Sequence, residues 1–347
     1  MSDPISEPAS SHVHSNRIAD INLLLVAAIW GVNIAIMKLA LNEIDLFRFN
    51  SIRLTLSAVV LGIFVWVENK KRNDSALAKK AALDEAAPPR VRKWLTIAAF
   101  AIMAGGVYQI LFAVGMNRTT AGNTALIMSS MPMWTAVLSF VLIREKLGLA
   151  WVGLTITFLG TLVVTLQKGG FQFDSESLAG NGLVLLAALA WAMGAVVSRP
   201  MLKFVSPIRL AFFSTAGTLP IHYAMPYIMN SPDVAEVWTP KIVACILYSG
   251  IFSTGLAYAM WNFGVQQLGP SHAAVYQNLV PLIACIAAWI FLREQISAMQ
   301  IIGGSLIIFG LYITRRLRPK PMKLPRGKPA QFASDSVGQV VNSQRIP

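Results

Sequence analysis

The sequence predicts an all-α integral membrane protein in which ten transmembrane helices form two inverted five-helix repeats around a central cavity. Hydrophobic residues make up 55% of the 347 residues and charged residues only 13%, whereas soluble proteins carry roughly 25% charged residues. Apolar runs of about 20 residues recur along the chain, and each is long enough to cross the hydrocarbon core of a bilayer. Glycine, proline and charged residues also recur at matching positions in the two halves of the chain.

Ten helices are obtained when the chain is divided at charges, at proline and glycine clusters and at polar runs. The first follows a polar segment that lacks the positive leader of a cleavable signal, so we expect it to remain as a span. The second is the weakest, because Arg48 and Arg53 crowd its start. The predicted helices cover residues 21–41, 52–67, 94–116, 124–143, 150–166, 182–197, 210–229, 242–263, 273–292 and 298–314.

The basic residues are distributed unequally between the two sides of the membrane. With the N-terminus in the cytoplasm, 22 of the 29 fall inside, Lys38 falls within the first span, and the six outside are Arg48, Arg53, Arg118, Lys168, Lys241 and Arg293. Basic residues are retained on the cytoplasmic side of membranes. We therefore expect a multi-pass protein of the cell membrane, in particular a bacterial inner membrane, with both termini cytoplasmic. This distribution explains the net charge of +13 without nucleic acid as a partner.

Three polar segments lie outside the helices. Residues 1–20 form an N-terminal cytoplasmic tail, residues 68–93 a basic cytoplasmic loop, and residues 317–347 a disordered basic cytoplasmic tail. The loop and the C-terminal tail either attract anionic lipid headgroups or act as simple stop-transfer anchors. Cys245 and Cys285 lie in apolar runs and are expected to be core residues. We predict no cofactor and no metal site, and the sequence does not indicate an oligomeric state.

Residues 21–166 and 182–316 are two copies of one unit. Trp30 is followed eight residues later by Lys38, as Trp191 is by Arg199. An odd number of helices per copy inverts the second copy in the membrane, which is characteristic of transporters. At a shift of 149 or 150 residues the matched pairs are Gly106 and Gly255, Gly115 and Gly264, Pro132 and Pro281, Glu145 and Glu294, Gly153 and Gly303, and Gly160 and Gly310. The last four glycines are expected to allow close helix contact.

Three segments resemble a known family. WGVNIAIMK, AGNTALIMSSMPMWTAVLSFVLIREKL and SHAAVYQNLVPLIACIAAWIFLREQI are similar to the EamA-type branch of the drug/metabolite transporter superfamily. The resemblance covers about residues 21–316. It implies ten helices in two inverted halves around a central cavity, and transport of small metabolites, often the export of amino acids or amphipathic compounds. It does not identify the substrate.

Pro132 and Pro281 fall near the middle of their predicted helices. A proline there removes one backbone hydrogen bond and frees the carbonyl four residues earlier, in this case that of Met128 or Gln277. In lipid such a carbonyl is tolerated only where it faces protein or a wet cavity. Either these two helices line the transport path, or the prolines only kink the bundle.

Polar and aromatic residues within the spans predict a nearly uncharged substrate pocket. Trp30, Asn33 and Met37 share one face of the first helix, with Lys38 at its edge. The alternative for each aromatic residue is helix packing or interfacial anchoring, although Trp30 lies too deep in its span for an interfacial anchor. The other predicted pocket residues are Tyr108, Gln109, Trp191, Tyr258, Trp261, Asn262, Tyr276 and Gln277.

Charged residues near the helix ends have two interpretations. Lys38 and Arg199 either neutralise a substrate carboxylate or extend to the membrane interface. Glu145 and Glu294 each directly follow an arginine, and we expect them to pair locally or to cap a helix N-terminus. We group them with Arg199 as gating residues. His222 is expected to take part in hydrogen-bonded packing rather than in a proton relay.

The sequence thus predicts a secondary transporter, and not an enzyme. It is expected to move small zwitterionic or amphipathic metabolites, amino-acid-like and including aromatic ones, by alternating access, with export favoured by the resemblance. A carrier for nucleotide sugars or phosphorylated metabolites would need several cationic residues in its cavity, and only Lys38 lies well inside a predicted span. A membrane-embedded enzyme would need clustered carboxylates, histidine pairs or a nucleophile with a base, and no Asp or Glu lies deep in any predicted span.

Overall fold

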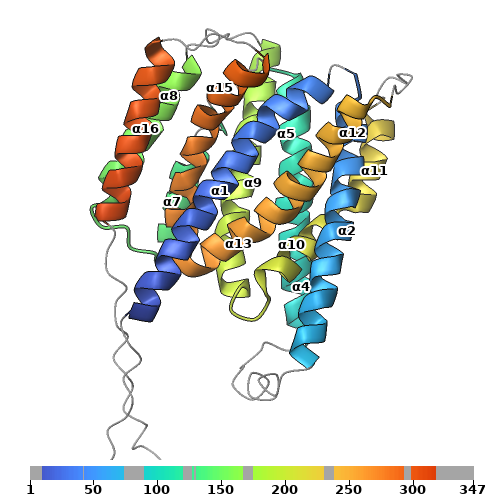
Figure 1. Cartoon of the computed structure of the whole chain (residues 1–347), viewed down its shortest axis with the longest axis horizontal. Helices are drawn as coiled ribbons and strands as arrows, with labels where there is room; N and C mark the ends of the chain where they lie inside the picture. The colour runs from blue at the N-terminus through green and yellow to red at the C-terminus, as the bar shows by residue number, and fades with distance from the viewer. Residues whose placement is uncertain are drawn as a thin grey trace, which may run out of the picture.

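The computed structural model describes residues 10–41, 43–73, 90–119, 127–128, 130–166, 175–229, 238–292 and 298–317. All regular secondary structure in this part of the chain is helical, and the helices form one bundle (Figure 1). Six helical stretches are long and apolar enough to cross a membrane, and α7 (Met131–Ile143) and α8 (Ala150–Leu166) are shorter apolar helices. Large apolar side chains such as Leu25, Phe140 and Ile308 are exposed, as expected of a surface that faces lipid.

The first half contains the first five spans in the predicted order. α1 (Ser10–Ala40) and α2 (Leu46–Asn73) both begin earlier than predicted. The third span consists of α4 (Arg90–Phe100), the π-helical segment η1 (Ala101–Val107) and α5 (Tyr108–Asn117). Of the fourth predicted helix, residues 124–126 and 129 lie outside the described residues, and α7 is its second part. α8 begins and ends where predicted.

The second half contains the other five spans, and two of them are broken where one helix was predicted. The seventh span is interrupted between α10 and α11, and the ninth by a 3-10 segment, η3. The elements are α9 (Ser175–Met201), α10 (Pro207–Ala216), α11 (Leu219–Ile228), α12 (Pro240–Leu247), π-helical η2 (Tyr248–Leu256), α13 (Ala257–Leu268), α14 (Pro270–Val275), η3 (Tyr276–Asn278), α15 (Leu279–Leu292) and α16 (Ala298–Arg316).

Pro132 and Pro281 lie in the first turns of helices. α7 begins at Met131 and α15 begins at Leu279, directly after η3, so Pro132 is the second residue of its helix and Pro281 the third. N–H groups in the first turn have no partner within the helix, so proline removes no hydrogen bond there. The carbonyl of Gln277, which we predicted to be free, accepts a hydrogen bond from the N–H of Leu279. In the ninth span the change from α14 through η3 to α15 therefore lies just before Pro281, where the proline was predicted to interrupt the helix.

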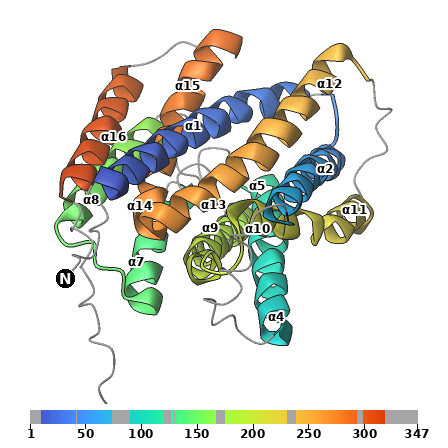
Figure 2. The same ribbon diagram turned by 60° about the horizontal axis from the view of Figure 1, so that its bottom comes forward.

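The packing of the two halves repeats when the halves are exchanged. α1 packs against η2, α13 and α15, and its counterpart α9 packs against η1, α5 and α7. α2 packs against α10 and α11, which together form its own counterpart, and α8 packs in the same way against α16. Figure 2 shows α8 and α16 side by side at one edge of the bundle. The two π-helical segments also lie at equivalent positions, in the third and eighth spans. The fold therefore contains the predicted internal repeat.

The glycine pairs bring the backbones of α8 and α16 into contact. A Cβ added to Gly153 would lie 2.6 Å from the carbonyl oxygen of Gly310, and one added to Gly160 would lie 2.7 Å from that of Gly303. Real Cβ atoms do not approach a backbone oxygen so closely. The glycines therefore allow close helix contact as predicted, and the contact joins the last helix of one repeat to the last helix of the other.

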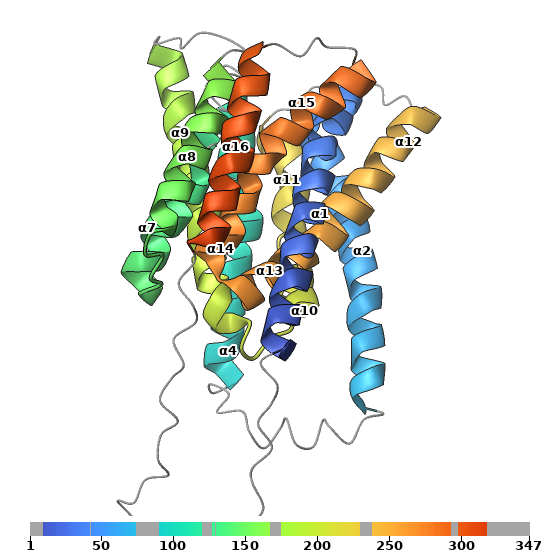
Figure 3. The same cartoon turned by 60° about the vertical axis from the view of Figure 1, so that its left-hand side comes forward.

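The start of α1 and the end of α16 lie at the same end of the bundle (Figure 1 and Figure 3). An ion pair joins them, with 2.6 Å between Nη2 of Arg315 and Oδ2 of Asp20. The hydroxyl of Tyr276 donates to the other oxygen of Asp20 at 2.5 Å. We call this end of the bundle the terminal side. An even number of spans places both ends of the chain on one side of the membrane, in agreement with this geometry.

Candidate functional site

Five aromatic side chains from α1, α5, α9 and α13 pack on one another within the bundle. Trp191 lies in the middle of this aromatic cluster. Its ring centroid lies 5.7 Å from that of Trp30, 4.9 Å from Tyr108, 6.2 Å from Tyr258 and 6.0 Å from Trp261. Both repeats contribute to the cluster. These five residues were all predicted for the pocket from positions scattered over more than 230 residues of sequence.

Hydrogen bonds fix the outer members of the aromatic cluster. Nε1 of Trp30 donates to the carbonyl oxygen of Ser253 in η2 at 3.0 Å. The hydroxyl groups of Tyr258 and Ser214 lie 3.2 Å apart. Nε1 of Trp191 is buried and has no partner among the described residues. A buried N–H without an acceptor costs free energy, so the central tryptophan presents an unused donor.

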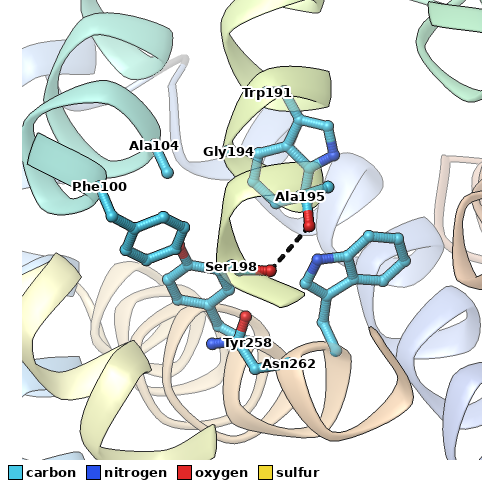
Figure 4. A pocket seen from close by; sticks show the side chains of 9 residues that line it. Phe100, Ala104, Trp191, Gly194, Ala195, Ser198, Tyr258 and Asn262 are labelled. Atoms are coloured by element: carbon cyan, nitrogen blue, oxygen red, sulfur yellow. Dashed lines mark hydrogen bonds between the residues drawn. The ribbon is translucent and has the colours of Figure 1, made fainter. Parts of the chain in front are cut away.

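The aromatic cluster borders a cavity of about 10 Å³, which is room for one water molecule. Figure 4 shows how the side chains around it face one another. Within the described residues the aromatic rings therefore leave no space for a metabolite at this place. The cavity is lined by Phe100, Ala104, Trp191, Gly194, Ala195, Ser198, Tyr258, Trp261 and Asn262.

Three of the predicted pocket residues lie elsewhere. Asn33 is buried against η2, where its Oδ1 accepts a hydrogen bond of 2.5 Å from the hydroxyl of Ser249. Met37 packs in a separate hydrophobic cluster with residues of α12. Tyr276 bonds to Asp20 at the terminal side. Their positions within spans predicted that these residues face protein, which they do, but at contacts with η2, α12 and α1 and not at the aromatic cluster.

The remaining predicted pocket residues differ in their surroundings. Asn262 lines the small cavity and lies 3.5 Å, Nδ2 to carbonyl oxygen, from Pro207. Gln109 is half-buried beside Tyr108 in α5. Gln277 is buried in η3, and its Oε1 has no hydrogen-bond partner among the described residues. The side chain of Lys38 and the whole of Glu294 lie outside the described residues.

Glu145 connects the two repeats at the terminal side. It lies between α7 and α8, and its Oε2 accepts hydrogen bonds from the hydroxyl of Ser271 at 3.0 Å and from the N–H of Ser271 at 3.4 Å. Nδ1 of His272 donates to Oε1 at 3.3 Å, and Nη1 of Arg199 lies 3.7 Å from the same oxygen. Of the two alternatives predicted for Glu145, the structure shows the cap, because the carboxylate accepts the N–H of Ser271 in the first turn of α14, while its ion-pair partner Arg199 lies in the other repeat and is not a local one. We call these four residues the gate cluster.

The gate cluster keeps Glu145 ionised. Burial pushes the pKa of Glu145 upwards, but the hydrogen bond and charge of His272, the charge of Arg199 and the hydroxyl of Ser271 together hold that pKa below its ordinary value. The backbone at Gly269 brings α14 against this carboxylate with φ of 92°, in the region that favours glycine. The gate cluster is therefore a charged contact between a loop of the first repeat and two helices of the second.

A second cavity of about 200 Å³ lies beside the gate cluster at the terminal side. Its lining combines the polar side chains of Asp20, His272 and Arg315 with apolar ones. It is separate from the small cavity, because the two share no lining residue. Its other lining residues are Leu268, Val275, Tyr276, Leu311 and Thr314.

The sequence analysis missed a buried cation, Arg53. We counted it among the external basic residues at the start of the second predicted helix, whereas α2 begins at Leu46 and Arg53 lies well inside this helix with 8% of its surface exposed. Its Nε donates to Oδ1 of Asn50 at 2.8 Å and its Nη1 to Oγ1 of Thr254 at 3.1 Å. The spacing of Asn50 and Arg53, three residues apart on one helix face, was the available signal. Polar residues on a shared face indicate a buried network more than a loop.

His222 continues the network from Arg53. Its Nε2 lies 2.9 Å from the carbonyl oxygen of Gly105, which only accepts, so Nε2 carries a proton. Its Nδ1 lies 3.2 Å from Nδ2 of Asn50. Because Arg53 occupies Oδ1 of Asn50, the amide presents its N–H to His222, and Nδ1 accepts. The imidazole is therefore neutral and fully hydrogen-bonded, which agrees with the packing role that we predicted.

Comparison with known proteins shows the same organisation in two halves. Residues 17–166 and residues 178–316 match the EamA-like transporter family. The chain belongs to this family. It is similar to YoaV, an uncharacterized transporter of Bacillus subtilis, with 25% identity over 294 residues that cover 84% of this chain and 95% of YoaV. It is also similar to an uncharacterized transporter of Archaeoglobus fulgidus, with 26% identity over 295 residues that cover 84% of this chain and 95% of the relative.

A crystal structure with 19% sequence identity has the same fold, with a TM-score of 0.69 over 86% of this chain and 98% of the other. Membership of the EamA-like family makes the chain a multi-pass membrane transporter and not an enzyme. A small molecule is therefore its substrate. The predicted family, the helical fold and the general function are confirmed.

Proposed function

We propose that this transporter moves small zwitterionic or amphipathic metabolites by alternating access, with the aromatic cluster as the wall of the substrate path. The observation that carries the proposal is the unpaired N–H of Trp191 at the centre of five aromatic rings from both repeats. Aromatic faces bind apolar groups and cations, and the indole N–H binds an acceptor on the metabolite. The proposed pocket residues are Trp30, Tyr108, Gln109, Trp191, Tyr258, Trp261, Asn262 and Gln277.

Alternating access is supported by the way in which the two repeats meet. The gate cluster joins the repeats at the terminal side, and the aromatic cluster joins them further inside. A rigid movement of one repeat against the other breaks both contacts together. The resemblance to exporters of amphipathic compounds supports export over uptake.

The charge distribution supports a cytoplasmic terminal side, in a bacterial inner membrane. Of the six basic residues counted as external, Arg48 and Arg53 lie within α2, and 22 of the 29 are counted as internal. Single cysteines at positions 75 and 170 test the orientation in intact cells. An impermeant thiol reagent should label position 170 and not position 75, and the reverse result would exclude this orientation.

The pocket is tested with Trp191→Phe, which keeps an aromatic ring and removes the N–H. A ligand-stabilisation screen of the purified protein against amino acids, purines and lipophilic cations first supplies a ligand. Loss of one hydrogen bond should then weaken binding and exchange of that ligand about 2- to 13-fold. The matched control is Trp66→Phe, because Trp66 is 64% exposed on the outside of the bundle. Equal effects of the two substitutions would contradict the pocket.

A further inference from the structure

Arg53 is a buried cation without an anionic partner. It is more than nine-tenths buried, and within the described residues no carboxylate lies within ion-pairing distance of its guanidinium. A charge in the interior of a membrane protein is costly and is normally paired. An unpaired one has to be explained by a role that compensates this cost.

The neighbours of Arg53 orient its guanidinium without neutralising it. Asn50 and Thr254 each accept one hydrogen bond, so three of the five guanidinium N–H groups are left without a partner among the described residues. His222, which closes the network, is neutral because its Nε2 donates to the carbonyl of Gly105 while its Nδ1 accepts from the amide of Asn50. The network therefore fixes the orientation of the planar, positively charged guanidinium and leaves N–H groups that can bind an anion.

The guanidinium lies next to the aromatic cluster. Nη1 of Arg53 donates to Thr254 in η2, and the carbonyl oxygen of the preceding residue, Ser253, accepts the indole N–H of Trp30, a member of the cluster. A metabolite against the tryptophan rings thus has a cation within reach of one end. The described interior offers a single such cation, which suits a monoanion, whereas a phosphate dianion needs several. The planar fork of arginine matches the two oxygens of a carboxylate.

We propose that Arg53 binds the carboxylate of the transported metabolite while the aromatic cluster holds its apolar body. The substrate class is then a small organic acid or amino acid with an apolar side chain. This inference rests on the proposed function, because it takes the aromatic cluster as the substrate path. It assigns an ionic contact to α2, which contributes no residue to the aromatic cluster.

The test compares acids with their amides, which have nearly the same shape and lack the negative charge. The probes are L-phenylalanine and L-phenylalaninamide, L-leucine and L-leucinamide, and indole-3-acetate and indole-3-acetamide. Binding is measured by the thermal shift of the purified protein, and exchange is measured in reconstituted vesicles. The wild type should bind at least one acid about 10- to 150-fold more tightly than its amide, as expected of a hydrogen bond to a charged group.

Substitutions of Arg53 test its charge and its hydrogen-bonding geometry separately. Arg53→Gln should reduce the preference for the acid to about 1, and Arg53→Lys, which keeps the charge without the fork, should give an intermediate preference. Arg209→Gln is the control, because Arg209 already pairs with Glu68 at 3.5 Å and should leave the preference unchanged. If Arg53→Gln does not fold, the comparison is made with Arg53→Lys and with the wild type alone.

The outcomes distinguish this inference from the proposed function. A wild type that prefers no acid over its amide, or an Arg53→Gln protein that keeps the full preference, would overturn the carboxylate site. If the transporter in that case still exchanges a purine or a lipophilic cation, and Trp191→Phe reduces this exchange, the proposed function stands without the carboxylate site. Absence of exchange for every probe would overturn both.

Discussion

Replacing Gly269 by alanine tests whether the gate cluster closes the substrate path. Gly269 has φ of 92° and ψ of 156°, a backbone conformation that residues with a Cβ adopt only under strain. A Cβ at this position would also meet the guanidinium of Arg199 and the carboxylate of Glu145. Alanine therefore disturbs both the backbone and the ion pair of the closed conformation.

The expected size of the effect follows from the backbone strain. A residue with a Cβ in this region costs about 1–3 kcal/mol, and the contacts with Arg199 and Glu145 act in the same direction. A conformation that is open at the terminal side, in which Gly269 relaxes to negative φ, does not carry this cost. The equilibrium between the two conformations should therefore shift about 5- to 150-fold towards the open one.

The shift is measured by the accessibility of a cysteine behind the gate cluster. Ser198 lines the small cavity and is buried, so Ser198→Cys serves as the reporter after Cys245 and Cys285 are replaced by alanine. In inside-out vesicles an impermeant thiol reagent should modify it about 5- to 150-fold faster in Gly269→Ala. Gly182→Ala is the control, because a Cβ at Gly182 has no neighbour within 4 Å. An unchanged rate accompanied by a lower melting temperature would refute the gating role.

Three further predictions concern packing, pH and energy coupling. Gly160→Leu should lower the melting temperature by the equivalent of about 1–3 kcal/mol, because its Cβ would lie 2.7 Å from the carbonyl oxygen of Gly303, whereas the exposed Leu159→Ala should have little effect. The wild type should be more stable than Glu145→Gln at neutral pH. A carboxyl group with a lower pKa in the folded than in the unfolded state stabilises the protein above its unfolded-state pKa, and this stabilisation is lost as the pH falls through its folded-state pKa. Thermal unfolding should therefore show the difference in stability shrinking below pH 4.5, the ordinary pKa of Glu. An imposed pH gradient should produce no net accumulation of substrate in vesicles, because His222 is neutral and fully hydrogen-bonded; accumulation that is lost in His222→Gln would contradict this.

The helices and the repeat follow from the sequence, because each depends on local composition or on regular spacing. An apolar run of about 20 residues has few alternatives to a membrane span. Glycines seven residues apart lie on one helix face, so Gly153 and Gly160 identify the side of α8 that meets α16. The breaks at η3 and before α11 depend instead on contacts between helices, which composition does not report.

The candidate site is only partly predictable for the same reason. A polar residue in a span predicts that its face meets protein, and it does not say which neighbour. Asn33 therefore bonds to Ser249 and Tyr276 to Asp20, outside the aromatic cluster. Arg53 was counted as external because the predicted helix began at residue 52, six residues after the observed start of α2. The start of a helix near several arginines depends on tertiary contacts, here the hydrogen bond of Arg53 to Thr254 of η2.

The unpaired charge of Arg53 also favours exchange of substrates over return of an empty carrier. In the empty protein any conformational change moves an uncompensated guanidinium through a low-dielectric interior, where its desolvation is not offset. A bound carboxylate neutralises it, and the neutral pair crosses between conformations at lower cost. The neutral His222 and the absence of carboxylates close to Arg53 in the described network leave the substrate itself as the compensating charge. Substrate on the far side should therefore accelerate transport, as in an exchanger whose direction is set by the solute gradients.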